Sequence, residues 1–315
     1  MKLAPIVLFV YNRPRHTSQT LEALARNEGA SDSILYIFAD GPKGNASVEE
    51  MSKINETRKI IKSKQWCKKV SINERENNIG LASSIMEGVT EIVNKYGKII
   101  ILEDDIITSR VFLRFMNDAL AYYQNHEKVA GISGFKYPSE PNFQKVHFLP
   151  IGCSWGWATW EKCWDETEFD AKKLLQMIEE KKLASDLNFG GYEFYNMLKN
   201  QVDGLIDSWA IRFYTSFFIA NKYFVYPPVS LVQNAGFDNF ATNTATNDNF
   251  FDLVKTGISN YEFSEPILGI ESLYVKNAFE NKYLNYGFTE NKKTKSGMYY
   301  VKKIAQLFKS KIRNN

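Results

Sequence analysis

Three consecutive carboxylates, Glu103, Asp104 and Asp105, directly follow an apolar run and form what we call the acidic triplet. Clustered carboxylates repel one another unless a cation neutralises them, and oxygen ligands suit hard ions such as Mg2+ or Mn2+. The alternative is a solvated turn whose acids favour the N-terminus of the next helix. Because Arg13 and Asp40 follow two other apolar runs, we favour a site for Mn2+ or Mg2+.

Tryptophans gather in the middle of the chain, and another follows an acid farther on, in Asp207-Ser208-Trp209. Sugars present apolar C–H faces that aromatic rings can cover, whereas large aromatics also simply fill cores. Glycines beside Trp155 and Trp157 give close backbone access. We therefore expect Trp155, Trp157 and Trp209 to form a surface for a sugar acceptor, and expect Trp160 and Trp164 to lie in the core.

Residues 152–156 match Gly-x-Ser-x-Gly, the turn that carries the nucleophile of α/β-hydrolases. That fold needs a histidine after the serine, but the last histidine, His147, precedes Ser154. Pro150 also lies where a central strand should run, and proline is poorly suited to a central strand. The sequence therefore argues against a serine hydrolase.

The elements that must position these residues alternate in the first third of the chain. The pattern predicts strands at 5–11, 34–38, 70–73 and 98–102, and helices at 17–25, 48–61 and 80–93. Such alternation implies a parallel sheet with right-handed crossovers, in which ligands bind beyond the carboxyl ends of the strands. Since Arg13, Asp40 and the acidic triplet follow three of these strands, we expect them at one edge of the sheet.

Beyond the acidic triplet the pattern is less regular. We expect helices at 111–123 and 207–221, strands and loops over 129–153, and a mobile loop over the Asn-, Thr- and Asp-rich residues 238–249. The chain of 315 residues, 44% of them hydrophobic, suits one large domain or two fused lobes. No apolar run is long enough to cross a membrane, and the short run 3–11 reads as a buried strand rather than a signal peptide.

Charge is unevenly distributed along the chain. The formal net charge is +3, yet residues 291–315 hold eight Lys or Arg and no acid, so the rest of the chain is acidic. A nucleic-acid-binding domain spreads basic charge over its folded face, so we expect no nucleic-acid partner. Three cysteines cannot form an even disulfide framework, which favours a reducing, cytoplasmic location. The dinucleotide-binding glycine pattern and the P-loop are both absent.

The basic tail has a helical pattern of its own. Residues 298–313 form a predicted amphipathic helix whose apolar face comprises Val301, Ile304, Ala305, Phe308 and Ile312, with lysines and Arg313 opposite. Such a helix suits an anionic membrane surface, which would place the protein on the inner face of the cell membrane and make a lipid-linked acceptor plausible. The alternative is a helix docked on the body of the protein with its lysines in water.

The order of these motifs resembles that of glycosyltransferases with the GT-A fold. The resemblance covers about residues 3–240 and rests on Tyr11-Asn12-Arg13, Phe38-Ala39-Asp40-Gly41, Asn78-Ile79-Gly80-Leu81, Leu102-Glu103-Asp104-Asp105, Gly156-Trp157 and Asp207-Ser208-Trp209. It is greatest to the N-acetylglucosaminyltransferase I type and to related bacterial family 2-like sugar transferases. It implies a Rossmann-like, mostly parallel sheet flanked by helices, with an acceptor-binding subregion.

The resemblance also implies roles for single residues. Those that would bind the nucleotide are Tyr11, Arg13, Asp40, Glu103 and Asp104. Within this set Asp40 would hydrogen-bond the uracil, Arg13 would approach the diphosphate, and the two acids would contact the nucleotide and its ribose. Asp105 would hold the metal that bridges the diphosphate.

The related enzymes invert the anomeric centre and use a carboxylate as base on the acceptor hydroxyl. Asp207 is the acid just before Trp209, although Ser208 stands where relatives carry a second aspartate. Asp207 is therefore our candidate base, with Asp203 as the second candidate. The alternative for Asp207 is the N-cap of the helix that follows, a common role for aspartate.

Together these interpretations predict a metal-dependent, inverting glycosyltransferase. It would move a sugar, as a hexosyl or N-acetylhexosaminyl group, from a nucleotide-diphosphate sugar, most simply a UDP-sugar, to a hydroxyl of a glycan or lipid-linked acceptor in polysaccharide or glycoconjugate synthesis. Residues 1–105 would form the nucleotide-sugar half, 106–290 the acceptor half and 291–315 the tail. The alternatives are a sugar-phosphate nucleotidyltransferase and a non-catalytic carbohydrate-binding protein.

Overall fold

The structure is a computed structural model that describes residues 2–137, 145–237, 261–267, 272–278 and 280. The predicted loop 238–249, the tail 291–315 and the amphipathic helix predicted at 298–313 lie outside these residues. Within the described part of the chain, every helix is too short or too polar to cross a membrane.

An eight-stranded sheet forms the centre of the described structure, with the strand order β3-β2-β1-β4-β8-β6-β9-β7. Its strands are β1 (Ile6–Val10), β2 (Ile34–Ala39), β3 (Lys69–Glu74), β4 (Lys98–Glu103), β6 (Val129–Ser133), β7 (His147–Leu149), β8 (Trp157–Trp160) and β9 (Tyr223–Tyr226). The first four pair in parallel, as the sequence predicts. β8 runs antiparallel to both β4 and β6, so the second half of the sheet is mixed.

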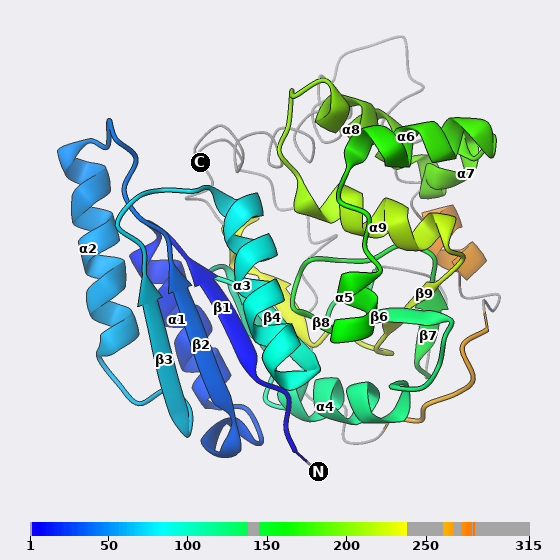
Figure 1. Cartoon of the computed structure of the whole chain (residues 1–315). Helices are drawn as coiled ribbons and strands as arrows, with labels where there is room; N and C mark the ends of the chain where they lie inside the picture. The colour runs from blue at the N-terminus through cyan, green and yellow to red at the C-terminus, as the bar shows by residue number, and fades with distance from the viewer. Residues whose placement is uncertain (1, 138–144, 238–260, 268–271, 279, 281–315) are drawn as a thin grey trace, which may run out of the picture.

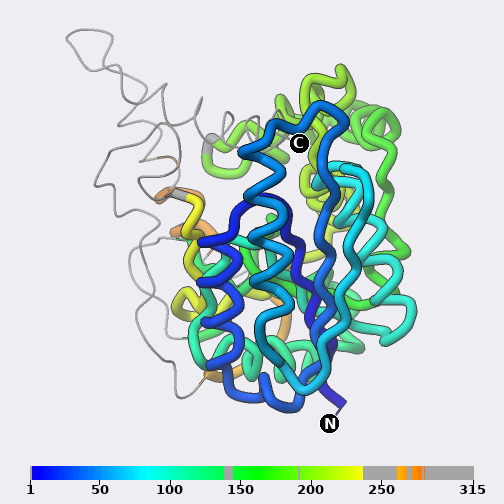
Figure 2. Tube along the Cα trace, turned by 90° about the vertical axis from the view of Figure 1, so that its left-hand side faces the viewer, coloured from blue at the N-terminus to red at the C-terminus, as the bar shows by residue number. Residues whose placement is uncertain are grey.

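Helices cover both faces of this sheet. They are α1 (Pro14–Ala25), α2 (Val48–Lys62), α3 (Leu81–Tyr96), α4 (Phe112–Tyr122), α5 (Glu161–Asp165), α6 (Ala171–Glu180), α7 (Ala184–Leu187), α8 (Phe194–Val202) and α9 (Trp209–Ile219). α1 and α2 pack together on one face of the parallel half, and α3 lies on the other (Figure 1). Figure 2, turned by 90°, shows the same layers. The predicted α/β class, a mostly parallel sheet flanked by helices, is confirmed.

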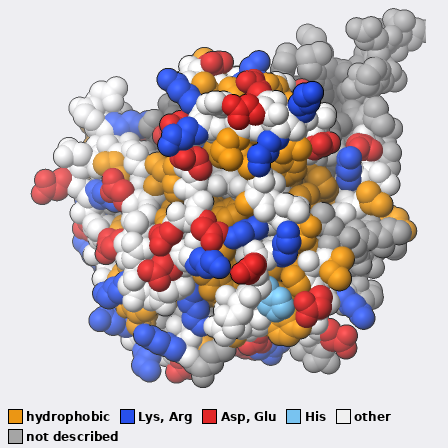
Figure 3. Space-filling model, turned by 45° about the vertical axis from the view of Figure 1, so that its right-hand side comes forward, with side chains coloured by type: hydrophobic (Ala, Val, Ile, Leu, Met, Phe, Trp, Pro, Cys, Tyr) orange, Lys and Arg blue, Asp and Glu red, His pale blue; other side chains and the backbone are white. Residues whose placement is uncertain are grey.

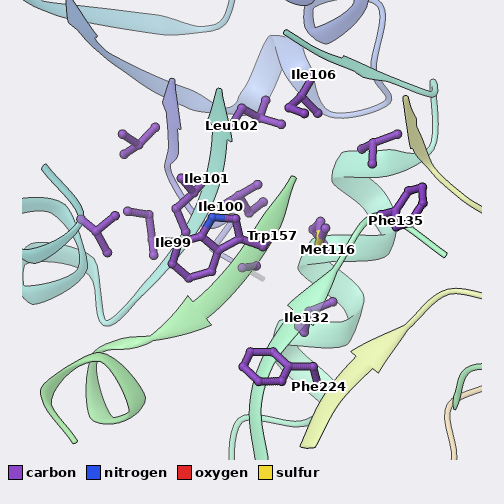
Figure 4. Packing of buried hydrophobic residues seen from close by; sticks show 14 of the residues in the cluster. Ile99, Ile100, Ile101, Leu102, Ile106, Met116, Ile132, Phe135, Trp157 and Phe224 are labelled. Atoms are coloured by element: carbon purple, nitrogen blue, oxygen red, sulfur yellow. The ribbon is translucent and has the colours of Figure 1, made fainter. Parts of the chain in front are cut away.

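The core explains why the central strands read as continuous apolar runs. All five residues of β1 are buried, and so are Ile99 to Leu102 of β4. Figure 4 shows these β4 side chains beside Trp157 of β8, with Ile132 and Phe224 of the mixed half nearby. A strand covered on both faces has no polar side to alternate with, so its sequence stays apolar.

A second, two-stranded sheet extends from the acidic triplet. β5 (Ile106–Thr108) follows the triplet directly and pairs antiparallel with β10 (Val232–Asn234). The short 3-10 turn Ala235–Phe237 follows β10. Two segments that are far apart in the sequence therefore meet where the triplet ends.

Surface charge is mixed on the face drawn in Figure 3, where acidic and basic side chains are interspersed with hydrophobic ones. The expectation of no nucleic-acid partner stays a prediction. Ser154 lies in a loop between β7 and β8 rather than in a strand-to-helix turn, which agrees with the argument against a serine hydrolase.

His147 makes folding stability depend on pH. Its ring is buried in β7 and stacks on Tyr226, and burial, with the charge of Lys136, lowers its pKa to about 3. An unfolded histidine titrates near 6.5, so the unfolded chain binds the additional proton as the pH falls below that value. This group therefore stabilises the fold above about pH 6.5, and the stability is lost as the pH falls toward 3.

We expect the free energy of unfolding in urea to fall by about 1 kcal/mol between about pH 6.5 and 5.5 through His147. The variant His147→Phe should lack this fall in the free energy of unfolding. The variant His126→Gln, which changes a partly exposed histidine, should show the same fall as the wild type. An equal pH dependence in wild type and His147→Phe would contradict the assignment.

Candidate active site

The carboxyl ends of β1, β2 and β4 meet at one edge of the sheet. Register places Phe9 beside Glu103 and Val10 beside Ala39, the residue before Asp40. Arg13 follows β1 by three residues and lies at the same edge. The structure thus brings Arg13 and the acidic triplet together, as the strand ends predict, with Asp40 following the adjacent strand.

Arg13 binds two members of the acidic triplet. Its Nη1 lies 2.8 Å from Oδ2 of Asp105, to which it donates a hydrogen bond, and 3.6 Å from Oδ1 of Asp104. The charge of Asp104 raises the pKa of Arg13, Asp105 and Glu103 add to the effect, and burial opposes it. The guanidinium is therefore held charged beside three carboxylates.

All three carboxylates are buried: Asp105 is 0% exposed, Glu103 7% and Asp104 8%. Charges in a low-dielectric interior are costly unless they are paired. Arg13 pairs with two of these acids, and carboxylates that lie this close together favour a bound cation.

Local structure holds both sides of this ion pair in place. Arg13 is the residue before α1, and Pro14 occupies the first helical position, where its fixed φ is compatible with the helix. From the same helix, Thr20 donates from Oγ1 to the backbone oxygen of Asp104 over 2.8 Å. Helix α1 therefore joins the end of β1 to the end of β4.

The donor chemistry at the triplet suits Mn2+ or Mg2+. Among the described residues, no three His, Cys, Asp or Glu side chains are grouped so that they could hold a metal ion. Mg2+ is commonly held by only one or two carboxylates together with substrate phosphates, so a complete protein cage is not required. Asp105, whose carboxylate faces the turn after β10, is the member we expect to bind the ion.

The turn after β10 brings a second oxygen atom close to that carboxylate. A Cβ at Gly236 would lie 2.5 Å from Oδ2 of Asp105 and 2.9 Å from Oδ1 of Asn234. Both oxygen atoms therefore pack closely against Gly236, where any side chain would displace one of them. This arrangement fits a small, hard cation.

Asp40 organises the neighbouring loop. Its Oδ1 accepts hydrogen bonds from the backbone N–H groups of Gly41 and Ile79, and its Oδ2 accepts them from Nδ2 of Asn78 and the N–H of Gly80, all within 2.8–3.1 Å. These four bonds use the usual acceptor positions of a carboxylate. The structure thus gives Asp40 a positioning role that the sequence did not predict, and its direct contact with a nucleobase stays a prediction.

Tyr11 lies between this loop and α2. Its hydroxyl donates to Oε1 of Glu50 over 3.3 Å, and its side chain is half-buried. Burial, followed by the charge of Glu50, raises the pKa of Tyr11 to about 12. The charge of Asp40 contributes to the same rise, which places Tyr11 beside the nucleotide-binding set. Its contact with the nucleotide stays a prediction.

The expected acceptor surface of tryptophans is largely wrong. Trp157 and Trp209 are 3% and 4% exposed, and their rings stack on each other with centroids 5.0 Å apart. Neither ring therefore presents a face to an acceptor, because each covers the other in the core. Trp155 differs, since it is only half-buried and packs edge-on against Phe135, so its role as an acceptor contact stays a prediction.

Asp207 is exposed and forms an ion pair with Arg212, whose Nη2 lies 3.1 Å from Oδ1 of Asp207. The N-cap of α9 is Ser208, whose hydroxyl accepts a hydrogen bond from the backbone N–H of Ile211, and not Asp207. The capping alternative for Asp207 is therefore wrong. Asp203 is also exposed and ends α8. The choice between Asp207 and Asp203 as base stays a prediction.

Helix α9 nevertheless adjoins the acidic triplet. Trp209 stacks on Trp157, and Trp157 pairs in register with Ile101, two residues before Glu103. Tyr214, also on α9, has a pKa raised by burial and, to a lesser extent, by the charge of Glu103. The N-terminus of α9, where Asp207 lies, is thus tied to the strand that carries the triplet.

No protein-family model matches the sequence, and no curated protein matches it. Solved structures that are similar include a mannosyltransferase from Pyrobaculum calidifontis in complex with GDP-Man and Mn2+, at 12% identity and a TM-score of 0.42, over 98% of this chain and 84% of that one. TarS of S. aureus is 12% identical with a TM-score of 0.28, over 45% of this chain and about a quarter (24%) of TarS. A UDP-glucose pyrophosphorylase complexed with UDP-glucose is 13% identical with a TM-score of 0.29, over 55% of this chain and 80% of the pyrophosphorylase chain. Likenesses this distant assign no family and no function to this chain.

Replacing Asp40 by asparagine tests its positioning role. Asparagine keeps one acceptor oxygen but sets an NH2 group against two of the four donors, so buried donors lose their partners. We expect Asp40→Asn to lower the free energy of unfolding in urea by about 2 kcal/mol or more. Asp170→Asn is the matched control, because Asp170 caps α6 and asparagine caps a helix equally well. Equal stabilities of the two variants would argue against the role.

Proposed function

We propose that the protein is a metal-dependent, inverting glycosyltransferase. It uses a nucleotide-diphosphate sugar, with a UDP-sugar as our candidate, and transfers the sugar to a hydroxyl of a glycan or lipid-linked acceptor. The observation that carries the proposal is the fully buried Asp105, paired with Arg13 at the carboxyl edge of a parallel sheet. This is where open α/β sheets bind ligands, and carboxylate oxygens gathered there suit a hard cation.

The donor side of the proposed reaction involves Arg13 and Asp105. Breaking a sugar–phosphate bond leaves a diphosphate with growing negative charge. The divalent ion, when bound, supplies Lewis-acid stabilisation of that charge. Asp105 holds the ion, and the guanidinium of Arg13, already oriented by Asp104 and Asp105, adds positive charge beside it.

The acceptor side involves α9. An inverting transfer needs a base on the acceptor hydroxyl, opposite the leaving group. Asp207 is exposed at the start of α9, and Arg212 orients its carboxylate. Asp207 precedes α9 by two residues, and α9 is tied to β4 through the stacked tryptophans. Asp207 therefore lies next to an element of fixed position, while its exposure keeps it open to an acceptor.

The two alternatives have less support. A nucleotidyltransferase usually carries a glycine-rich phosphate loop after the first strand, and here that turn is Asn12-Arg13-Pro14-Arg15. A binding protein that uses tryptophans would need exposed rings, but Trp157 and Trp209 cover each other. A peripheral membrane location through residues 298–313 stays a prediction on residues outside the described structure.

Transfer from UDP-, GDP- and dTDP-sugars, followed as release of the nucleoside diphosphate with Mn2+ or with EDTA, tests the function. Asp105→Asn keeps the volume and can still accept from Arg13, but it loses the charge that holds the ion. We expect it to lower the rate about a hundred-fold or more and to remove the response to Mn2+. Asp118→Asn is the control, because the Asp118 carboxylate accepts a hydrogen bond from the hydroxyl of Tyr261 and is not part of the proposed site, so this variant should keep full activity. Metal-independent transfer, or exchange of the nucleotide with pyrophosphate, would contradict the proposal.

The base is tested separately by Asp207→Asn. Asparagine cannot take the proton, so we expect kcat to fall about a hundred-fold or more, with the affinity for the donor nucleotide nearly unchanged. Stability should also be unchanged, because Ser208 caps α9. Asp203→Asn is the control and should stay active. An inactive Asp203→Asn beside an active Asp207→Asn would move the role to Asp203.

A further inference from the structure

The turn after β10 is held against the acidic triplet by the small sheet. Asn234 pairs in register with Ile106, the residue after Asp105. The backbone N–H of Ala235 then donates to the backbone oxygen of Asp105 over 2.8 Å. Residues 234–236, which we call the Asn-Gly turn, are thus fixed beside Asp105 by main-chain bonds that do not depend on side chains.

Within this turn the side chain of Asn234 is directed inward. It is only 9% exposed, and its Oδ1 accepts a hydrogen bond from the N–H of Gly236 over 2.8 Å. That bond orients the amide oxygen toward the space beside Gly236, where Oδ2 of Asp105 also lies. An amide oxygen and a carboxylate oxygen are both hard ligands.

Gly236 is required there for space and not for backbone conformation. It is absent from the glycines with positive φ, so other residues could adopt its backbone. A Cβ, however, would lie 2.5 Å from Oδ2 and 3.3 Å from Cγ of Asp105, and 2.9 Å from Oδ1 of Asn234. Cβ atoms in proteins essentially never come within 3.0 Å of non-bonded heavy atoms, so a side chain at this position would displace one of these oxygens.

We propose that the Asn-Gly turn is the second half of the cation site. Asn234 supplies an amide oxygen near Asp105, and the missing side chain of Gly236 lets the two oxygens keep their places beside each other. This inference rests on the proposed function, because it concerns the ion that Asp105 would hold. It adds a ligand and a positioning residue from a segment that no sequence motif marks.

Mn2+ binding to the full-length protein, without nucleotide and with UDP, provides the test. The electron paramagnetic resonance signal of free Mn2+ gives the dissociation constant without any assay of activity. We expect Gly236→Ala to weaken Mn2+ binding about ten-fold or more, since its methyl group displaces an oxygen. Asn234→Ala should weaken it similarly, and Asn234→Asp, which keeps an oxygen at the same place, should restore it.

Gly44→Ala is the matched control, because a Cβ at Gly44 meets nothing within 4 Å. Melting temperatures in EDTA distinguish a purely structural role, which would lower the temperature without changing the Mn2+ dissociation constant. If Gly236→Ala and Asn234→Ala both bind Mn2+ as tightly as Gly44→Ala, the turn has no part in the site, although the proposed function stands. If the wild-type protein binds no Mn2+ even with UDP, both the inference and the metal in the proposed function are wrong.

Discussion

The burial of negative charge at the end of β4 is the constraint on which the rest of the site depends. Asp105 is fully buried, and Glu103 and Asp104 are nearly so, while Arg13 is the cation that binds two of the three. Burying like charges together is costly unless cations or hydrogen bonds compensate for it. A fold keeps such an arrangement when a further cation or a ligand completes it, which is why we connect the triplet with metal-assisted chemistry.

Much of the surrounding structure serves to place this charge. Helix α1 carries Arg13 at its start and holds the backbone of Asp104 through Thr20. Asp40, which follows the neighbouring strand, accepts four hydrogen bonds from residues 41 and 78–80 and so shapes the adjacent loop. A substrate entering this edge meets groups that are already oriented, and preorganised groups need no reorganisation during the reaction.

The sequence was sufficient where local pattern and topology determine position. Apolar runs predicted β1, β2 and β4, and the short segment 70–73 predicted β3. The rule that the carboxyl ends of parallel strands share an edge placed Arg13 beside the triplet. The prediction that Trp157 and Trp209 form an acceptor surface was wrong, because the spacing and size of aromatic residues do not distinguish a sugar-binding face from a core face. Sequence reasoning also missed Asn234 and Gly236, which reach Asp105 through two three-residue strands too short to show a periodicity. The sequence did identify Asp40 as a candidate site residue. Its role in positioning the loop depends on hydrogen bonds from residues 41 and 78–80, which no sequence pattern reveals.

The buried tryptophans have a different role in this picture, one that links the two sides of the proposed reaction. Trp157 pairs with Ile101 of β4, and Trp209 stacks on Trp157 from the first turn of α9. Stacked aromatic rings in a close-packed core have little freedom to shift, so the start of α9 is fixed relative to the end of β4. A base must lie within hydrogen-bond distance of the acceptor hydroxyl while the leaving group is held elsewhere. Rings first expected to contact the sugar thus instead fix the position of Asp207, the acid proposed to activate the acceptor, relative to Asp105.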